Sequence, residues 1–371
     1  MHVNTVDELI SDIRQGRMVV LVDDDDDSNN EGVVMVAAEH VDAQHVNFMA
    51  RQARGLVCLA LTEERCQQLN LPPMVAEGRG EKSNFTLSIE ASVGIDTGIS
   101  AADRARTVLA AVAPQAVPGD IVQPGHIFPL TAMPGGVLTR AGHTEAASDY
   151  AGLAGLLPAA VIADILTPEG VLADGPALVE FAARHGLKIG TIASLIHHRM
   201  VNERTIERVR EGQVQTSYGS FQLTVYRDDT AGRLHLAVSK GEIHAWEPTL
   251  VRVHVGATMR DLITTEIPER ASWNIGACLA RVAEEGRGVI VLLAGHESDA
   301  RLLDSVDMAL GQAPSSLAAQ PDTYTIVGLG SQILKDLGVG KIHLMGAPIK
   351  YNAISGFDLE VLEYLAPDAR S

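Results

Sequence analysis

A charged and polar stretch, residues 203–219, divides the chain into two halves and limits the folds that are available to it. Its composition predicts the end of a helix followed by a linker. The whole chain has 371 residues, which is more than one hydrophobic core usually serves. We therefore expect two domains, spanning residues 1–210 and 219–371.

The first half alternates helical and strand-like segments. Thr5 is followed by acidic residues and by apolar residues at helical spacing, a pattern that predicts a capped helix over residues 5–14. Residues 18–22, Met-Val-Val-Leu-Val, form a short β-branched run that ends in acid, as expected of a buried strand leading to a functional loop. Similar segments continue to about residue 210, which predicts an α/β or α+β layered domain.

The second half begins with three segments typical of strands, at residues 220–227, 234–238 and 250–255. Helical and strand patterns then alternate. Helices are expected at residues 277–285 and 331–337, with a strand at 288–293. This order predicts a second α/β domain.

The net charge of −18 excludes whole classes of partner. A strongly acidic protein repels nucleic acid and anionic membranes at long range. No uninterrupted apolar run reaches the ~18 residues that a membrane-spanning helix needs. The first residues, Met-His-Val-Asn-Thr, lack the basic flank and apolar core of a secretory signal, so we expect a soluble, cytoplasmic protein. Any anionic substrate must then be attracted by a local cluster of cations.

One short motif combines groups that bind phosphate and metal ions. Starting at Arg140, the run Arg-Ala-Gly-His-Thr-Glu joins a guanidinium, an imidazole, a hydroxyl and a carboxylate. Arg140 and Thr144 suit a phosphate, which Gly142 lets the backbone approach closely. A neutral His143 can coordinate a divalent ion. The run is equally compatible with a polar loop before a helix that begins near Glu145, with Thr144 as its N-cap.

A second loop upstream has the properties of an anion site. Residues 97–104 read Thr-Gly-Ile-Ser-Ala-Ala-Asp-Arg, a run of small and hydroxyl-bearing residues that opens a helix. Backbone N–H groups at such a helix start can bind an anion, and Thr97 and Ser100 add hydroxyls. We expect this loop to help form the phosphate pocket, with Asp103 in a structural role.

Together with residues 125–130, Gly-His-Ile-Phe-Pro-Leu, these motifs resemble the signature of 3,4-dihydroxy-2-butanone 4-phosphate synthase, the lyase of riboflavin biosynthesis. The resemblance extends over residues 3–210. It implies conversion of ribulose 5-phosphate to 3,4-dihydroxy-2-butanone 4-phosphate and formate, Mg2+ or Mn2+ as cofactor, and a homodimer with sites at the subunit interface. His143 is the implied metal ligand. The implied substrate contacts are Arg140, Gly142, His143, Thr144, Thr97 and Ser100.

The expected metal-binding loop departs from this family. The family pattern is Asp-Arg-Glu-Asn-Glu-Gly-Asp, in which the first glutamate binds the metal. Residues 23–33 instead read Asp-Asp-Asp-Asp-Asp-Ser-Asn-Asn-Glu-Gly-Val. Aligning the two on Asn-Glu-Gly requires one inserted residue upstream. In this alignment, Ser28, Asn29 and Val33 occupy the positions at which the family has arginine, glutamate and aspartate, respectively.

Other carboxylates are candidates for the missing roles. Five consecutive aspartates repel one another, and a bound cation would relieve that repulsion, so Asp26 or Asp27 is one candidate ligand. The alternative is a solvated loop left after selection on catalysis relaxed. Asp164 stands where the family has glutamate, and we expect it to be the acid–base carboxylate. It is one methylene shorter, and a misplacement near 1 Å can reduce a rate about a hundredfold.

The second half resembles GTP cyclohydrolase II from about residue 219 to residue 367. That family holds zinc with three cysteines, whereas residues 255–276 contain none. The three cysteines of this chain, Cys58, Cys66 and Cys278, form no C-x-x-C pair. We therefore expect no zinc and no cyclohydrolase activity, and interpret this domain as a scaffold or pairing surface.

Two hypotheses describe the whole chain. The first is a synthase-type lyase of impaired or altered activity that binds a sugar phosphate and a divalent metal. The second is a catalytically silent paralogue that scaffolds or regulates a riboflavin-pathway enzyme. The lost zinc ligands favour the second hypothesis. The motif at Arg140 favours the first, because a pure scaffold needs no phosphate clamp.

Overall fold

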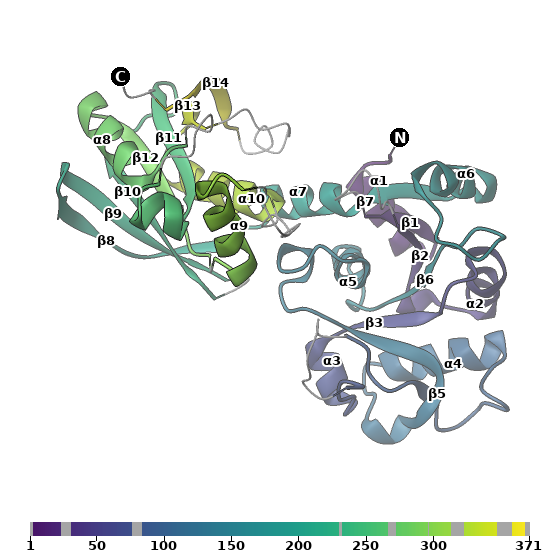
Figure 1. The fold of residues 1–371 in the computed structure, drawn as a ribbon. Helices are drawn as coiled ribbons and strands as arrows, with labels where there is room; N and C mark the ends of the chain where they lie inside the picture. The colour runs from purple at the N-terminus through teal and green to yellow at the C-terminus, as the bar shows by residue number, and fades with distance from the viewer. Residues whose placement is uncertain are drawn as a thin grey trace. The chain divides into compact units, whose positions relative to one another are not determined.

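The computed structural model describes residues 3–23, 31–75, 84–229, 232–265, 272–295, 297–312, 323–346 and 358–367 (Figure 1). The chain forms two compact units, Met1–His198 and Arg199–Ser371, and each unit contains a seven-stranded sheet. The predicted α/β fold with two domains is confirmed. Among the described helices, none is both long enough and apolar enough to cross a membrane.

The sheet of the first unit has the strand order β4-β5-β3-β6-β2-β1-β7. Its strands are β1 (Val19–Val22), β2 (Gly32–Ala37), β3 (Cys58–Thr62), β4 (Ile89–Ala91), β5 (Ile121–Ala132), β6 (Ala160–Asp164) and β7 (Lys188–Thr191). β3 pairs in parallel with β5, and β1 with β7; the other neighbours are antiparallel. The predicted strand β1 is buried along its whole length, as expected of a strand covered on both faces.

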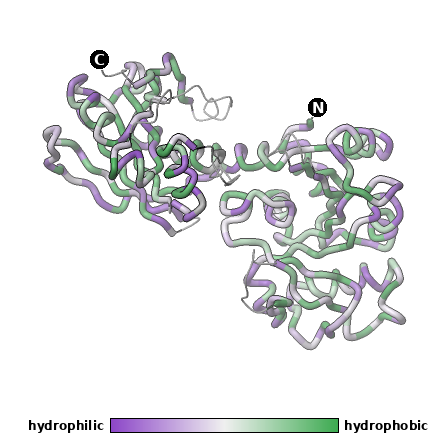
Figure 2. The backbone as a smooth tube through the Cα atoms, in the orientation of Figure 1, coloured by the Kyte–Doolittle hydropathy of each residue, from purple (hydrophilic) through white to green (hydrophobic). Residues whose placement is uncertain are grey.

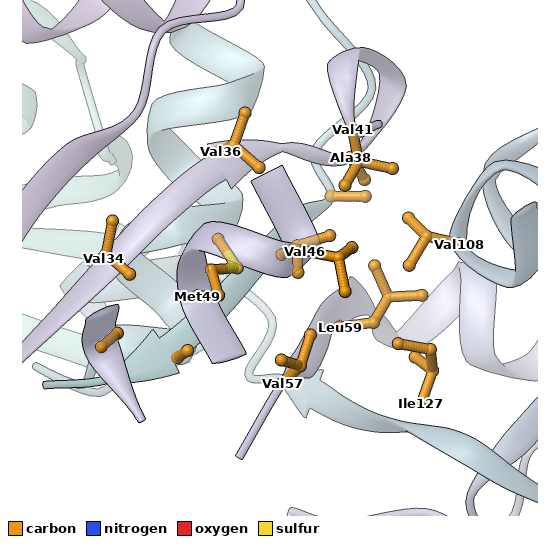
Figure 3. Packing of buried hydrophobic residues seen from close by; sticks show 14 of the residues in the cluster. Val34, Val36, Ala38, Val41, Val46, Met49, Val57, Leu59, Val108 and Ile127 are labelled. Carbon is orange, nitrogen blue, oxygen red and sulfur yellow. The ribbon is translucent and has the colours of Figure 1, made fainter. Parts of the chain in front are cut away.

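Helices pack on this sheet. They are α1 (Val6–Arg14), α2 (Ala43–Phe48), α3 (Glu63–Gln68), α4 (Ala101–Val112), α5 (His143–Leu153) and α6 (Gly175–His185). A further helix, α7 (Ile192–Asn202), follows β7 and continues past the end of the unit at His198. Val34 and Val36 of β2 join a hydrophobic cluster with residues of α2, α4 and α6 (Figure 3). Because side chains alternate along a strand, Met35 points to the opposite face, where α5 and α1 contact the sheet. The predicted cap of α1 is confirmed, since Thr5 and Glu8 exchange reciprocal hydrogen bonds.

The sheet of the second unit has the order β14-β13-β11-β12-β10-β9-β8. Its strands are β8 (Ile206–Thr216), β9 (Gly219–Asp228), β10 (Leu234–Lys240), β11 (Pro248–Val255), β12 (Gly288–Leu293), β13 (Lys341–Met345) and β14 (Glu360–Leu365). The helices α8 (Ile275–Glu285), α9 (Asp299–Ala309) and α10 (Thr323–Asp336) complete the unit. The strands and helices predicted in this half are confirmed.

The segment interpreted from the sequence as a linker instead contains a strand. β8 pairs along its length with β9 and forms the outer edge of the sheet. Most of its side chains are exposed, and hydrophilic residues are frequent along it (Figure 2). Charged side chains on an edge strand oppose pairing with other chains, so such a strand can have the composition of a linker.

Candidate functional site at the start of α5

The residues before the motif form the 3-10 helix Gly136–Leu138, and the predicted start of the next helix is wrong. The next helix, α5, begins at His143 rather than near Glu145, and its N-cap is Gly142 rather than Thr144. Glycine is an acceptable N-cap but gives a weaker sequence signal than a threonine hydroxyl, which explains the error.

Thr144 points inward instead of capping the helix. The residue is buried, and its Oγ1 accepts a hydrogen bond from Nδ2 of Asn84 at 3.2 Å. The hydroxyl proton therefore stays available for an anionic oxygen. Gly142 lies against the carboxylate of Glu145, because a Cβ at position 142 would stand 2.6 Å from Oε2. Glycine leaves the room that this close approach requires.

Arg140 lies at the wall of a cavity of about 620 Å³. Its side chain is half exposed, and Nη1 is 4.0 Å from Oε1 of Glu145, a separation too long for a hydrogen bond. The guanidinium therefore keeps donors for an anion. The lining also includes Glu63, Cys66, Gln67, Asn84, Thr131 and Met133, together with apolar residues such as Leu71 and Pro72.

His143 has a buried ring nitrogen without a partner. Its Nε2 is shielded from solvent and makes no hydrogen bond within the described part of the chain. Burial lowers the pKa of the imidazole, against the opposing fields of Asp23, Asp164 and Glu31 and a hydrogen bond with the backbone of Glu31. The ring is therefore neutral at pH 7, which is the form that binds a metal ion.

Asp164 ends β6, close enough to His143 to affect its pKa. Its side chain is exposed, and the buried Val33 stands opposite it on β2. Its backbone is fixed, because its carbonyl oxygen accepts a hydrogen bond from the N–H of Gly55 at 3.1 Å. Burial raises the pKa of the Cys58 thiol to about 12, and the charge of Asp164 adds to this effect.

Asp23 and Glu31 form the base of the acidic loop. The N–H of Asp23 donates to the carbonyl oxygen of Glu31 at 2.9 Å and extends the pairing of β1 with β2. The sequence analysis assigned no role to Glu31. Its position directly before the buried strand β2 could have marked it as a candidate site residue. Asp26 and Asp27 lie outside the described residues. Among the residues that are described, no three His, Cys, Asp or Glu side chains gather to hold a metal ion.

Thr97 and Ser100 belong to a separate cluster at the start of α4. The Oγ of Ser100 caps the helix by accepting a hydrogen bond from the N–H of Asp103 at 3.0 Å. Asp103 in turn accepts one from the N–H of Gly98 at 3.1 Å, in agreement with its predicted structural role. Thr97 is exposed. Within the described ranges, no hydrogen bond joins this loop to Arg140.

His126 extends this second cluster. Its Nδ1 lies 2.6 Å from Oε1 of Glu90, and the Glu90 carboxylate fills the space that a side chain at Gly98 would occupy. Gly98 also has a φ of +80°, a left-handed conformation that favours glycine. The Thr97–Ser100 loop, Glu90 and His126 therefore form one polar surface, a grouping that the sequence did not reveal.

Comparison with known proteins decides the family. The sequence pattern of 3,4-dihydroxy-2-butanone 4-phosphate synthase matches residues 7–198, and that of GTP cyclohydrolase II matches residues 207–366. A protein of Pseudomonas aeruginosa named 3,4-dihydroxy-2-butanone 4-phosphate synthase is 53% identical over 98% of this chain and 99% of its own length. The chain belongs to the 3,4-dihydroxy-2-butanone 4-phosphate synthase family. The riboflavin biosynthesis protein RibBA of Aquifex aeolicus is 45% identical over 97% of this chain and 91% of its own.

Solved structures of this synthase family share the fold. RibBX, a two-domain 3,4-dihydroxy-2-butanone 4-phosphate synthase from A. baumannii, has a TM-score of 0.84 at 47% identity and covers 98% of this chain and 100% of its own. A 3,4-dihydroxy-2-butanone 4-phosphate synthase in complex with two magnesium ions has a TM-score of 0.52 at 37% identity. It covers 54% of this chain and 98% of its own. The family resemblance inferred from the motifs is confirmed.

In the cyclohydrolase-like unit, Asp261 lies within residues 255–276, the stretch that contains no cysteine. Oδ2 accepts hydrogen bonds from the N–H of Ala257 at 2.8 Å and from Nη2 of Arg260 at 2.9 Å. The same oxygen is 3.0 Å from Nε2 of the buried His254, while Oδ1 accepts from the N–H of Ile275 at 3.0 Å. Burial opposes ionisation, but these hydrogen bonds lower the pKa of Asp261 to about 2. The carboxylate thus ties the end of β11 to the start of α8.

Proposed function

We propose that the chain is a 3,4-dihydroxy-2-butanone 4-phosphate synthase-type lyase of impaired or altered activity. It would convert ribulose 5-phosphate to 3,4-dihydroxy-2-butanone 4-phosphate and formate. The observation that supports this most is the start of α5. There a neutral imidazole, whose Nε2 has no partner within the described residues, follows the available guanidinium of Arg140 by three positions. The activity named for the relative in Pseudomonas aeruginosa agrees with this reading.

The phosphate of the sugar binds beside Arg140 and Thr144 in this proposal. The guanidinium fork offers parallel N–H donors, and the Thr144 hydroxyl, held in place by Asn84, offers one more. The N-terminus of α5 adds favourable backbone dipoles for an anion. Because the cavity at Arg140 has a volume of about 620 Å³, it leaves room for a small sugar phosphate.

A divalent ion, Mg2+ or Mn2+, is proposed to bind at His143. The Nε2 atom fits that role because it is buried and lacks a partner in the described part of the chain. Magnesium prefers oxygen ligands, so we propose Asp26 and Asp27 as further ligands. When bound, such an ion stabilises negative charge on the vicinal oxygens of the sugar. The related synthase crystallised with two magnesium ions supports this cofactor.

Asp164 is proposed to transfer protons. Its carboxylate stands near His143 on a backbone that Gly55 holds in place. The side chain is one methylene shorter than the glutamate of the family, and the opposite residue, Val33, supplies no second carboxylate. We therefore expect slow turnover or a related sugar phosphate as the substrate, because acid–base catalysis depends on close placement.

A homodimer is proposed to complete the site. Thr97 and Ser100 lie in a cluster of their own, with no hydrogen bond to Arg140 in the described residues. In a dimer with interfacial sites, the loop of one protomer reaches the α5 site of its partner and contacts the substrate there. Light scattering of the purified chain tests this arrangement. A monomer that still releases formate at an undiminished rate would contradict it.

The second unit is proposed to act as a scaffold without zinc or cyclohydrolase activity. A silent paralogue that scaffolds or regulates another riboflavin-pathway enzyme remains the second candidate function for the whole chain. The buried Val33 favours this candidate, because it is 1% exposed and replaces a carboxylate beside the proposed acid–base residue.

Formate release decides between these two functions. The purified chain is incubated with ribulose 5-phosphate and Mg2+, alongside a variant that carries Ser28→Arg and Asn29→Glu. Metal-dependent formate from the unmodified chain supports the lyase. Formate from the variant alone identifies the acidic loop as the lesion and favours the silent paralogue. Absence of formate from both proteins, despite measurable binding of the sugar phosphate, contradicts the lyase.

A further inference from the structure

Glu145, the third residue of α5, carries a buried carboxylate whose two oxygens are unequally satisfied. The residue is 0% exposed. Oε1 accepts a hydrogen bond from the N–H of Met133 at 3.0 Å, whereas Oε2 is buried with no hydrogen-bond partner among the described residues. A buried carboxylate oxygen without a donor reduces stability. Folding alone therefore does not account for this side chain.

The carboxylate lies next to Arg140 and against the backbone of Gly142. Oε1 is 4.0 Å from Nη1 of Arg140, which is beyond hydrogen-bond range but close enough for attraction in a partly buried site. Oε2 lies 2.6 Å from the place where a Cβ at position 142 would stand. The Arg140 side chain is 51% exposed at the cavity wall. Glu145 thus attracts one end of the guanidinium while other donors stay free for an anion.

We propose that Glu145 is a positioning residue that orients the Arg140 guanidinium for the substrate phosphate. This inference rests on the proposed function of the same site. A free arginine loses rotamer freedom when it binds an anion, and a fixed negative charge nearby restricts that freedom in advance. The hydrogen bond to Met133 also anchors the cavity wall. Glu145 does not serve His143 in the same way, because that imidazole hydrogen-bonds the backbone of Glu31.

Asp149 provides a matched comparison on the same helix. Its Oδ2 accepts a hydrogen bond from the N–H of Val137 at 2.8 Å, and its carboxylate fills the space beside Gly136. Asp149 therefore anchors the turn that precedes the motif through backbone contacts. The variant Asp149→Asn therefore measures how much the anchoring of this loop contributes to substrate binding and to stability. It does so without the effect on Arg140 that is proposed for Glu145.

Glu145→Gln keeps the size of the side chain and the acceptor for Met133 but removes the charge. In steady-state assays of formate release, KM for ribulose 5-phosphate should rise about five- to tenfold while kcat stays within about twofold. Loss of a negative charge near an anion site would by itself lower KM, so an unchanged or lower KM overturns the proposal. Asp149→Asn should lower the thermal midpoint and leave KM unchanged. An equal rise in KM in that variant also overturns it, because loop anchoring would then be sufficient.

Phosphate binding makes the test independent of turnover. Calorimetric titration of the full chain with inorganic phosphate should show a Kd raised about five- to tenfold by Glu145→Gln. In an Arg140→Ala background the same substitution should change nothing further. A further loss there would overturn the proposal, because Glu145 would not act through Arg140. If Glu145→Gln fails to fold, Glu145→Asp replaces it, because aspartate keeps the charge but holds it one methylene farther from Arg140. The Kd for inorganic phosphate should then rise less than in Glu145→Gln. An unchanged Kd would count against the positioning role.

The two proposals fail in distinguishable ways. Phosphate binding that responds to Glu145→Gln as expected, without formate release from the unmodified chain, supports the positioning role and refutes the lyase. Formate release with a KM that Glu145→Gln leaves unchanged supports the lyase and refutes the positioning role. An unmodified chain that binds no inorganic phosphate overturns the positioning role.

Discussion

The carboxylate of Asp261 should make the second unit sensitive to acid. Its hydrogen bonds lower its pKa in the folded chain from the ordinary 3.8 to about 2, although burial opposes this. One pKa unit corresponds to about 1.4 kcal/mol, so the ionised carboxylate stabilises the folded unit by about 2 kcal/mol. Because the folded-state pKa is depressed, this contribution is complete well above pH 4 and is lost as the pH falls through about 2. Near pH 3 about half of it should remain.

Tryptophan fluorescence measures this unit selectively. The two tryptophans of the chain, Trp246 and Trp273, both lie in the second unit, and Trp273 is buried. Urea unfolding of the full chain and of Asp261→Asn is therefore followed by tryptophan emission at pH 7 and pH 3. Asparagine keeps the shape of the side chain without its charge. The difference in unfolding free energy between the two proteins should narrow by about 1 kcal/mol between pH 7 and pH 3.

If the difference in unfolding free energy between the unmodified chain and Asp261→Asn were the same at pH 7 and pH 3, the reasoning would be refuted. The Asp261 carboxylate would then titrate alike in the folded and unfolded chains. The matched control is Glu284→Gln on α8, where the side chain is 78% exposed. A surface carboxylate of this kind contributes little to stability. The unfolding free energy of that variant should therefore match that of the unmodified protein at both pH values. A pH-dependent change as large as that of Asp261→Asn would show that loss of any negative charge has the same effect.

Three further outcomes are expected. His143→Ala should abolish any metal-dependent formate release, and unchanged metal-dependent turnover would exclude His143 as a ligand. Elemental analysis of the purified chain should find far less than one zinc per chain, whereas stoichiometric zinc would contradict the argument from the absent cysteines. Gly55→Ala should destabilise the chain by about 1–3 kcal/mol in thermal unfolding, because its Cβ would stand 2.3 Å from the carbonyl oxygen of Asp164. Gly119→Ala, whose Cβ would meet no atom within 4 Å, should leave the midpoint unchanged.

Local signals predicted the secondary structure well where the cause of the structure is itself local. The cap at Thr5 and the apolar spacing after it determine α1, and the β-branched run of β1 is buried on both faces. β8 was missed because its role as an edge strand comes from pairing with β9, and its own residues are mostly charged and polar. Exposure on the outer edge of a sheet and exposure in a linker select the same residue types.

The set of side chains at the start of α5 was predictable from the motif, whereas their supporting contacts were not. Arg140, His143 and Thr144 lie within five residues, so their proximity needs no fold. The hydrogen bond from Asn84 to Thr144 spans 60 positions of sequence, and no pattern near either residue announces it. The contacts of Gly98 with Glu90 are likewise a product of the fold, because Glu90 lies on β4 and no pattern near the loop announces them.

The carboxylate of Asp261 and the polar groups at the start of α5 differ in how fully they are hydrogen-bonded. Asp261 uses both carboxylate oxygens, and each hydrogen bond holds one part of the second unit to another. At the start of α5, by contrast, Nε2 of His143 and Oε2 of Glu145 are buried without partners in the described residues. Such groups reduce the stability of the folded chain, and a ligand that supplies partners for them offsets that loss. The network at Asp261 is therefore explained by folding, whereas the binding proposed at α5 would account for Nε2 of His143 and Oε2 of Glu145.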